Sequence, residues 1–154
     1  MEERPQDSII TEEMHRAIGA ELEPVVLEVE KSHIRRFAQA IDDPNPLWQD
    51  EEYARKTRYG GIIAPPTFLC VVRSEAIPKL PFQHSFPRRL NGANRWELFL
   101  PVRPGDTITA RPRISDIYER PSRLGTMLGL VTETTYANQR GEVVARHWGT
   151  TFLY

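Results

Sequence analysis

Four β-rich segments in the second half of the chain constrain the possible fold most strongly. Each is rich in β-branched and aromatic side chains, and turn signals such as Pro-Gly-Asp at 104–106 and Asn-Gln-Arg-Gly at 138–141 separate them. The segments lie at residues 94–100, 107–118, 126–137 and 143–153. The pattern predicts an antiparallel sheet formed mainly by one half of the chain.

The first half of the chain predicts one strand and several short helices. Residues 25–30 are β-rich, and Ser32 is expected to cap a helix that follows them. Two prolines, Pro44 and Pro46, end that helix and produce a rigid polar loop. Asp50 is expected to cap a second short helix that continues to residue 57.

The most apolar helix is predicted at residues 68–77, after Pro66 and before Pro78. We expect this helix to be buried. Cys70 within it has no neighbouring charge that would activate it, which favours a buried structural thiol over a nucleophile.

These elements predict an α+β fold in which a strongly curved antiparallel sheet wraps around the apolar helix. The 154 residues suffice for one domain of ordinary size. We expect a tail or one short helix from Thr11 within residues 1–24, and a single domain over residues 25–154. Long alternating strands also leave an edge that can pair with a second subunit, so dimerisation is expected.

Charge and cysteine content exclude several classes of function. Twenty basic and 21 acidic residues give a formal net charge of −1, which provides no global field for nucleic acid or an anionic membrane. The single cysteine cannot form an intrachain disulfide, and no apolar run reaches membrane length. We expect a reducing, cytoplasmic setting with no nucleic-acid or membrane partner.

Several segments resemble a known family. The segment from Phe37 through Asp43 and Asn45 to Trp48 resembles the hydratase-2 motif of MaoC-like (R)-specific enoyl-CoA hydratases, which ends in Gly-Asp-x-Asn-Pro-Leu/Ile-His. Three further segments resemble the N-terminal-type, FAS1-like MaoC dehydratases, and they lie at residues 58–67, 102–107 and 132–142. The resemblance covers residues from about 25 to the C-terminus and implies the hot-dog fold, in agreement with the sheet-around-helix prediction.

The activity that the resemblance implies is reversible addition of water to a 2-enoyl thioester. This chemistry needs a proton carrier, a group that orients the water and a donor for the enolate oxygen. Asp43 occupies the motif Asp position, whereas Trp48 occupies the His position and its indole is no base. Pro65 and Pro66 align with the family's His-Gly, whose glycine N–H would stabilise the enolate, and proline has no N–H to donate.

The resemblance also bears on individual residues. Alone, the Asp-Pro-Asn-Pro sequence is more often a helix-ending turn than a catalytic loop, but the surrounding matches favour a site-derived loop in which Asp43 is a relic or an orienting residue. Trp48 is interpreted as a buried aromatic residue that fills the volume of the missing imidazole. The substrate-binding residues implied by the resemblance are Asn45, Trp48, Gly61, Ile62, Ala64, Pro65 and Thr67.

No other residue is marked as a replacement base. We expect His15, His33 and His84 to be solvated and His147 to be a satisfied strand histidine. No spacing suggests a metal site or a phosphate loop, so the chemistry is expected to need no cofactor beyond a coenzyme A or acyl-carrier-protein thioester as substrate. Arginines that could contact coenzyme A phosphates are at positions 88, 89, 111, 113 and 120, although a solvated face is the better explanation for any one of them.

The first functional hypothesis is a non-catalytic, substrate-binding subunit of an enoyl hydratase or 3-hydroxyacyl dehydratase. A second MaoC-like subunit with the Asp and His would be its partner, in a heterodimer or heterotetramer. An alternative is a homodimeric hydratase or thioesterase that uses Asp43 with another base, for which His84 is the candidate. A third possibility is an acyl-thioester binding module without a catalytic partner.

Overall fold

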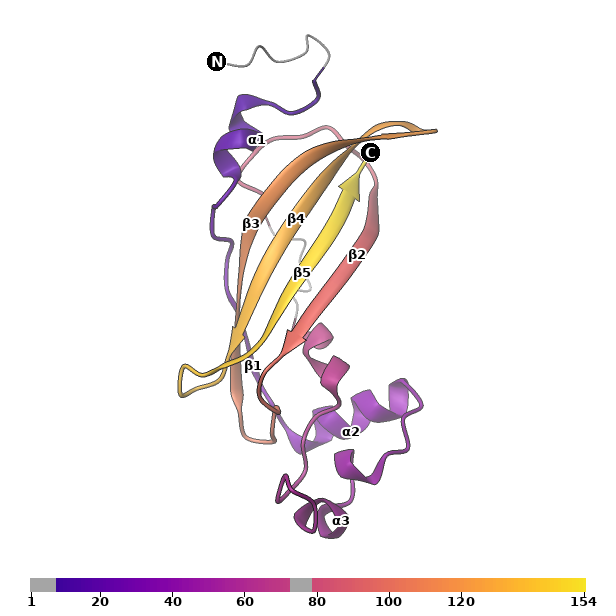
Figure 1. The fold of residues 1–154 in the computed structure, drawn as a ribbon, viewed down its shortest axis with the longest axis vertical. Coiled ribbons are helices and arrows are strands. Elements are labelled where there is room, and N and C mark those ends of the chain that lie inside the picture. Colours follow the sequence, from indigo (N-terminus) through magenta and orange to yellow (C-terminus); the bar gives the residue numbers. More distant parts are fainter. Residues whose placement is uncertain (1–7, 73–78) are drawn as a thin grey trace.

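A curved, five-stranded antiparallel sheet forms the body of the protein in a computed structural model that describes residues 8–72 and 79–154 (Figure 1). Its strand order is β1-β3-β4-β5-β2. The strands are β1 (Val25–Glu28), β2 (Arg89–Leu98), β3 (Thr107–Ser122), β4 (Gly125–Ala137) and β5 (Val143–Leu153). β1 and β2 are therefore the two edges of the sheet.

The predicted strands are confirmed, and β2 begins earlier than expected. It starts at Arg89 because residues 89–98 pair with β5 across a register shift between Asn91 and Ala93. Residues 89–93 include Asn and Gly and lack regular apolar alternation, so the sequence pattern did not indicate a strand there.

Short helices lie mainly at one end of the sheet, below β1 and β2 in Figure 1. The helical elements are α1 (Glu12–Ala17), α2 (Lys31–Ala40), η1 (Pro46–Trp48), α3 (Glu51–Arg55) and η2 (Pro66–Val71), where η marks a 3-10 helix. Asp50 caps α3 as predicted, and its side chain accepts a hydrogen bond from the Tyr53 N–H. Thr11 caps α1 in the same way.

Two helix predictions need correction. α2 begins two residues earlier than expected, at Lys31, so Glu30, and not Ser32, is its N-cap residue. The predicted α-helix at 68–77 is a 3-10 helix over its first part, because two successive prolines at its start favour a tight turn, and residues 73–78 lie outside the described residues. Cys70 on this turn is exposed, which contradicts the expected buried thiol.

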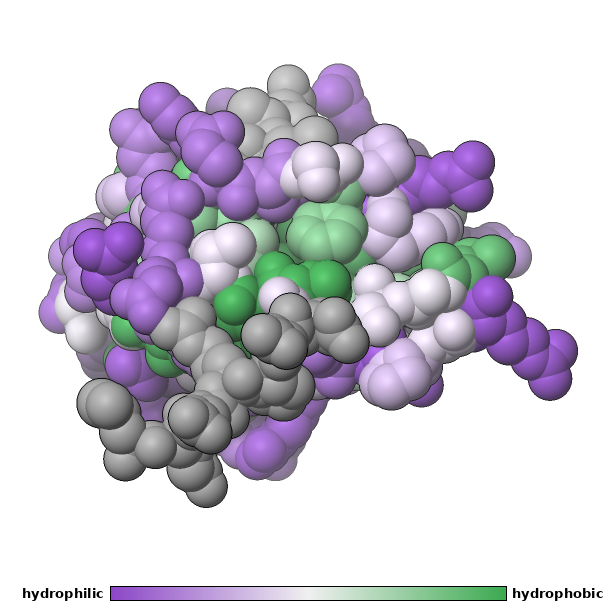
Figure 2. All heavy atoms as spheres, turned by 90° about the horizontal axis from the view of Figure 1, so that it is seen from above, coloured by the Kyte–Doolittle hydropathy of each residue, from purple (hydrophilic) through white to green (hydrophobic). Residues whose placement is uncertain are grey.

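The core has two parts, one at each end of the sheet. The larger part packs α2, η1 and η2 against the sheet, with Ile34, Phe68 and Ile108 almost fully buried. The smaller part lies under α1, where Met14 and Ala17 pack against side chains such as Leu128. Seen from the α1 end, polar side chains surround a smaller exposed apolar area (Figure 2). Among the described residues, no helix is long and apolar enough to cross a membrane.

Candidate functional site

The loop between α2 and α3 turns sharply at Asp42, which adopts a left-handed backbone conformation with φ of 53°. This position corresponds to the glycine of the hydratase motif, and glycine adopts such a conformation without steric cost. The Asp43 N–H donates to the Ala38 carbonyl at 2.9 Å and so joins the turn to the end of α2. The local backbone thus retains the conformation for which the motif glycine is suited.

Both carboxylate oxygens of Asp43 accept hydrogen bonds from within this loop. The Asn45 N–H donates to Oδ1 at 3.1 Å, and the indole Nε1–H of Trp48 donates to Oδ2 at 2.9 Å. The Asn45 side chain in turn accepts from the Leu47 N–H at 3.0 Å and caps η1. The residue in the histidine position therefore contacts the aspartate directly, as a hydrogen-bond donor that has no basic nitrogen.

Trp48 is also part of the core, with 7% of its surface exposed. It shares the larger core with Ile62, Ala64 and Phe68, which confirms its interpretation as a buried aromatic residue. Phe37, the aromatic residue of the motif, meets the Phe68 ring edge-on at a centroid distance of 5.6 Å. The hydratase-motif loop and the segment at residues 58–67 therefore pack into one core.

In the second predicted loop, backbone N–H donors are missing or already bonded at residues 64–66. The Ala64 N–H donates to the Val102 carbonyl at 2.8 Å, and Pro65 and Pro66 have no N–H. The first N–H that follows the prolines belongs to Thr67, which is an exposed residue. Of the predicted substrate-binding residues, Asn45 and Thr67 are exposed, Gly61 is half-buried, and Ile62, Ala64, Pro65 and Trp48 are buried.

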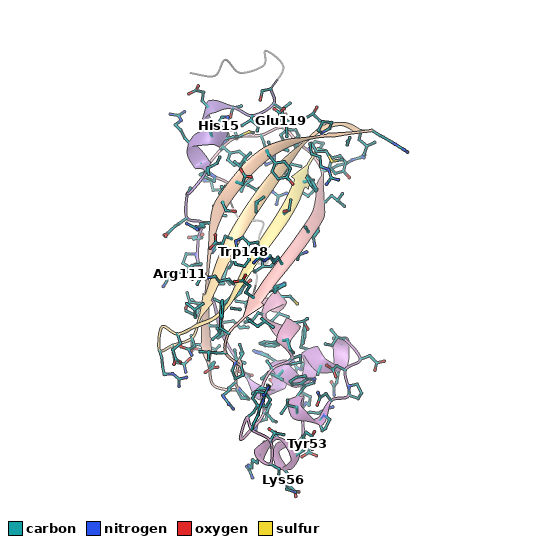
Figure 3. The ribbon with its side chains drawn as sticks, in the orientation of Figure 1. His15, Tyr53, Lys56, Arg111, Glu119 and Trp148 are labelled. Carbon is teal, nitrogen blue, oxygen red and sulfur yellow. The ribbon has the colours of Figure 1, made fainter. Side chains whose placement is uncertain are left out.

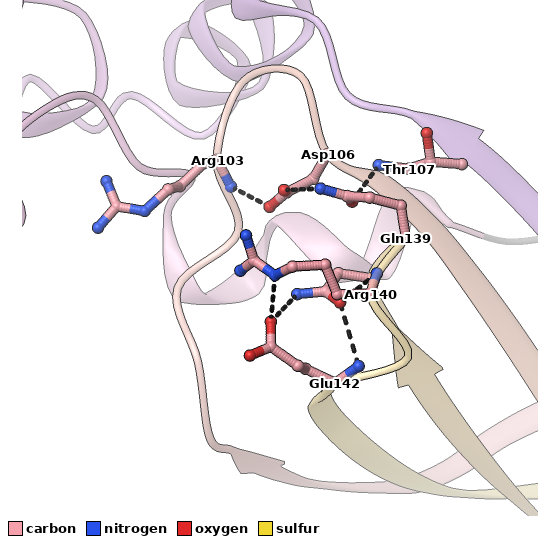
Figure 4. A network of polar contacts seen from close by, with 7 residues as sticks. Arg103, Asp106, Thr107, Gln139, Arg140 and Glu142 are labelled. Carbon is pink, nitrogen blue, oxygen red and sulfur yellow. Dashed lines mark hydrogen bonds and ion pairs between the residues drawn. The ribbon is translucent and has the colours of Figure 1, made fainter.

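Two of the other family-like segments contact each other directly (Figure 4). The Asp106 carboxylate accepts from the Arg103 N–H at 2.8 Å and from the Gln139 side-chain amide at 3.1 Å. The Gln139 carbonyl oxygen then accepts from the Thr107 N–H at 3.0 Å. This network joins the turn at residues 103–106 to the hairpin between β4 and β5.

The histidines occupy separate places. His84 lies in the loop before β2, beside α1, because the N–H of the preceding residue, Gln83, donates to the Glu13 carboxylate of α1. This is the end of the sheet opposite α2 and α3. His84 is half-buried, and its Nδ1 is buried and forms no hydrogen bond among the described residues, so the expected solvation of His84 is only partial. His147 is buried, stacks on Trp96 and bonds to the Asn94 side chain at 2.9 Å, as expected of a satisfied strand histidine.

The sequence did not reveal the hydrogen bond between Trp48 and Asp43, because only the positions of the two side chains in the fold show that the indole N–H meets the carboxylate.

Two of the arginines considered as phosphate ligands contact other side chains of the sheet. Arg113 forms an ion pair with Glu133 at 2.9 Å, and the Arg120 guanidinium lies over the Phe152 ring. The labels in Figure 3 place Arg111 on the sheet, far from Tyr53 of α3 and from Lys56, which follows this helix. Within the described residues, no group of three or more His, Cys, Asp or Glu side chains could hold a metal ion.

The curved sheet and the altered Asp-x-Asn-Pro-Leu loop define a hot-dog protein of the MaoC-like hydratase and dehydratase class. A family model described as the FAS1-like dehydratase domain region matches residues 16–147, and the chain belongs to this family.

Several known proteins are similar to the chain. A UPF0336 protein from Thermobifida fusca is 37% identical over 125 residues, which cover 79% of this chain and 80% of that protein. A probable enoyl-CoA hydratase alpha subunit from Thermomonospora curvata is 28% identical over 73% of this chain and 40% of that protein.

Solved structures agree in fold. The MaoC-like dehydratase from Rhodospirillum rubrum is 25% identical, with a TM-score of 0.69 over 90% of this chain and 92% of that one. The C-terminally truncated HadBC (3R-hydroxyacyl-ACP dehydratase) complex from Mycobacterium tuberculosis is 24% identical and also gives 0.69, over 88% of this chain and 96% of that one.

Proposed function

We propose that this chain is the non-catalytic, substrate-binding subunit of a heteromeric 2-enoyl-thioester hydratase or 3-hydroxyacyl dehydratase. A second hot-dog subunit with an intact Asp and His motif would perform the water chemistry. The observation that carries this proposal is the hydrogen bond from the Trp48 indole to Asp43, in the position where the family motif places a histidine.

This hydrogen bond leaves Asp43 without the partner that hydration requires. A water molecule that attacks the enoyl double bond must lose a proton to a base, and the motif supplies an aspartate and an imidazole for that purpose. Here the indole N–H and the Asn45 N–H each donate to one carboxylate oxygen, and the indole cannot accept a proton. In this proposal Asp43 stabilises the loop, which has no second base beside it, and the partner supplies the Asp and His pair.

The position of β2 at the edge of the sheet supports pairing with a second subunit. Within the part of the chain that the structure describes, β2 pairs with β5 on one side only, and residues 89–95 of this strand are exposed. Exposed apolar side chains accompany this edge, with Leu90, Leu98 and Phe99 each about half exposed. An exposed strand edge with apolar side chains favours pairing with another sheet. Similarity to a hydratase alpha subunit and to the HadBC complex agrees with such an assembly. A reducing, cytoplasmic setting for the complex remains part of the proposal.

The test is reconstitution with a hot-dog protein that carries the intact motif. Size-exclusion chromatography should yield a stable complex, and the complex should hydrate 2-enoyl-CoA while this chain alone does not. Substitution of the partner's motif Asp or His should abolish the activity. Unchanged activity after that substitution would contradict the proposal, and tight thioester binding without any stimulation of a partner would favour a binding module.

The homodimeric alternative receives no support from the position of His84. Within one protomer, the loop with His84 lies beside α1, whereas Asp43 follows α2 at the opposite end of the sheet (Figure 1). General-base chemistry requires the base within hydrogen-bond reach of its proton. His84 therefore cannot act together with Asp43 of the same chain.

A further inference from the structure

A basic surface hollow lies beside the predicted substrate-binding segment. Its volume is about 220 Å³, and its lining residues are Lys31, Glu51, Arg55, Gly61, Ile62, Arg103 and Pro104. They come from the start of α2, from α3, from the second loop and from the turn before β3. Gly61 and Ile62 are among the residues for which the family resemblance implies substrate binding.

The charges around this hollow do not cancel. Lys31, Arg55 and Arg103 are cationic, and among the described residues Glu51 is the single acidic side chain that lines the hollow. Glu51 forms ion pairs with Lys31 and with Arg55, the latter at 3.2 Å. The hydrogen bond from Lys31, together with its charge, lowers the pKa of Glu51, so this carboxylate is ionised at neutral pH. One carboxylate thus holds two cations side by side, and the lining keeps an excess of positive charge.

Arg103 is the cation whose charge is least compensated. Its backbone N–H bonds to Asp106, while its side chain extends away from the Asp106 network in Figure 4 and forms no ion pair within residues 8–72 and 79–154. The turn that carries it is held to Val29, which lies between β1 and α2, by two backbone hydrogen bonds of 2.8 Å: the Val29 N–H donates to the Asp106 carbonyl, and the Gly105 N–H donates to the Val29 carbonyl. The guanidinium therefore projects from a well-anchored turn.

The hollow also has space for a ligand. A Cβ atom placed on Gly61 would meet no heavy atom within 4 Å. α2 has ten residues and is about 15 Å long, and it leads from Lys31 at the hollow to the loop that contains Asp43. An extended pantetheine arm can bridge a separation of this order.

We propose that this hollow binds a phosphate ester of the pantetheine-type carrier whose acyl thioester the complex processes. The proposal rests on the proposed function for the identity of the carrier. Guanidinium groups suit phosphate because their parallel N–H donors match its oxygens, and the ammonium of Lys31 adds a third source of charge. Coenzyme A and a phosphopantetheine-bearing carrier protein share this chemistry.

Calorimetric titration of the full chain with coenzyme A, 4′-phosphopantetheine and pantetheine tests the proposal. Coenzyme A should bind, and Arg103→Gln and Arg55→Gln should each weaken its binding about tenfold, the effect of one lost charge-assisted contact. Gly61→Asp, which adds a carboxylate in open space, should weaken it at least as much, and Glu51→Gln should strengthen it. Pantetheine, which lacks phosphate, should respond to none of these changes.

Neighbouring residues on α3 and at its C-cap supply matched controls. Glu52 and Lys56 form the same kind of (i, i+4) ion pair as Glu51 and Arg55, at 2.7 Å, but do not line the hollow. Lys56→Gln and Glu52→Gln should leave coenzyme A binding unchanged. An equal effect of Lys56→Gln and Arg55→Gln would overturn the proposal, as would coenzyme A binding that is absent or independent of Arg103.

The phosphorylated probes distinguish the source of the phosphate. Equal dependence of 4′-phosphopantetheine and coenzyme A on Arg103 assigns the hollow to the phosphate of the arm, which both carriers share. If only coenzyme A binding depends on Arg103, the hollow binds the nucleotide phosphates instead. These titrations need no partner, so they are independent of the reconstitution experiment. If coenzyme A binding depends on Arg103 but no partner restores hydratase activity, the proposed function is refuted while the phosphate site in the hollow stands.

Discussion

Replacement of Trp48 by phenylalanine isolates the hydrogen bond that distinguishes this loop. Trp48→Phe keeps an aromatic ring in the core but removes the Nε1–H that Asp43 accepts at 2.9 Å. A hydrogen bond to a charged group contributes about 1.5–3 kcal/mol, and the lower end applies because Asp43 is half-buried and water can replace the donor. We expect the lost hydrogen bond alone to cost about 1.5 kcal/mol, or about 3–6 °C in Tm for a chain of this size, and the smaller ring to add to that loss.

A double-mutant cycle separates the hydrogen bond from the change in ring size. Trp48→Phe, Asp43→Ala and the double variant are compared by urea denaturation, and Trp48→Ala, with an expected loss of about 3–5 kcal/mol, gives the full value of the buried ring. The coupling energy of the pair should be about 1 kcal/mol or more. Additivity within about 0.3 kcal/mol would refute the argument that the indole holds the carboxylate.

Three further perturbations test local features. Asp42→Gly should preserve stability, whereas Asp42→Val should cost about 1–2 kcal/mol in thermal unfolding because a β-branched residue opposes the positive φ. Gly129→Ala should destabilise by about 1–3 kcal/mol, since its Cβ would lie 2.5 Å from the Tyr118 ring; wild-type stability would contradict the packing. The Ser8 hydroxyl, with nearby backbone N–H groups, lowers the pKa of Glu119, so its stabilising contribution should exist above the ordinary glutamate pKa of about 4.3 and disappear as pH falls through the lowered value. Glu119→Gln should remove that part of the acid dependence of the unfolding free energy.

Local patterns predicted most of the secondary structure because they depend on neighbours in sequence. Alternating β-branched residues indicated β3, β4 and β5, and the Asp50 cap indicated α3. The start of β2 was missed because pairing with β5, and not intrinsic preference, makes residues 89–93 a strand. The exposure of Cys70 was missed because an apolar run does not reveal which side of a 3-10 turn faces the core.

For the candidate site too, residue identity predicted some features, and others depend on the fold. The absence of a base at Trp48 and of N–H donors at Pro65 and Pro66 follows directly from residue identity. The role of Trp48 as a hydrogen-bond donor to Asp43 does not, because it depends on the turn at Asp42 that brings the two side chains together. The basic hollow likewise brings together residues from four separate segments of the chain.

The most direct test of the central claim is the rate of the reconstituted complex when Asp43 is replaced by asparagine in this chain. Stopped-flow or absorbance assays of 2-enoyl-CoA hydration should give a kcat within about twofold of the unmodified complex, because Asp43 takes no part in proton transfer. The corresponding Asp→Asn substitution in the partner should reduce kcat by about 10²-fold or more. A comparable loss from Asp43→Asn, or turnover by this chain alone that Asp43→Asn abolishes, would contradict the account.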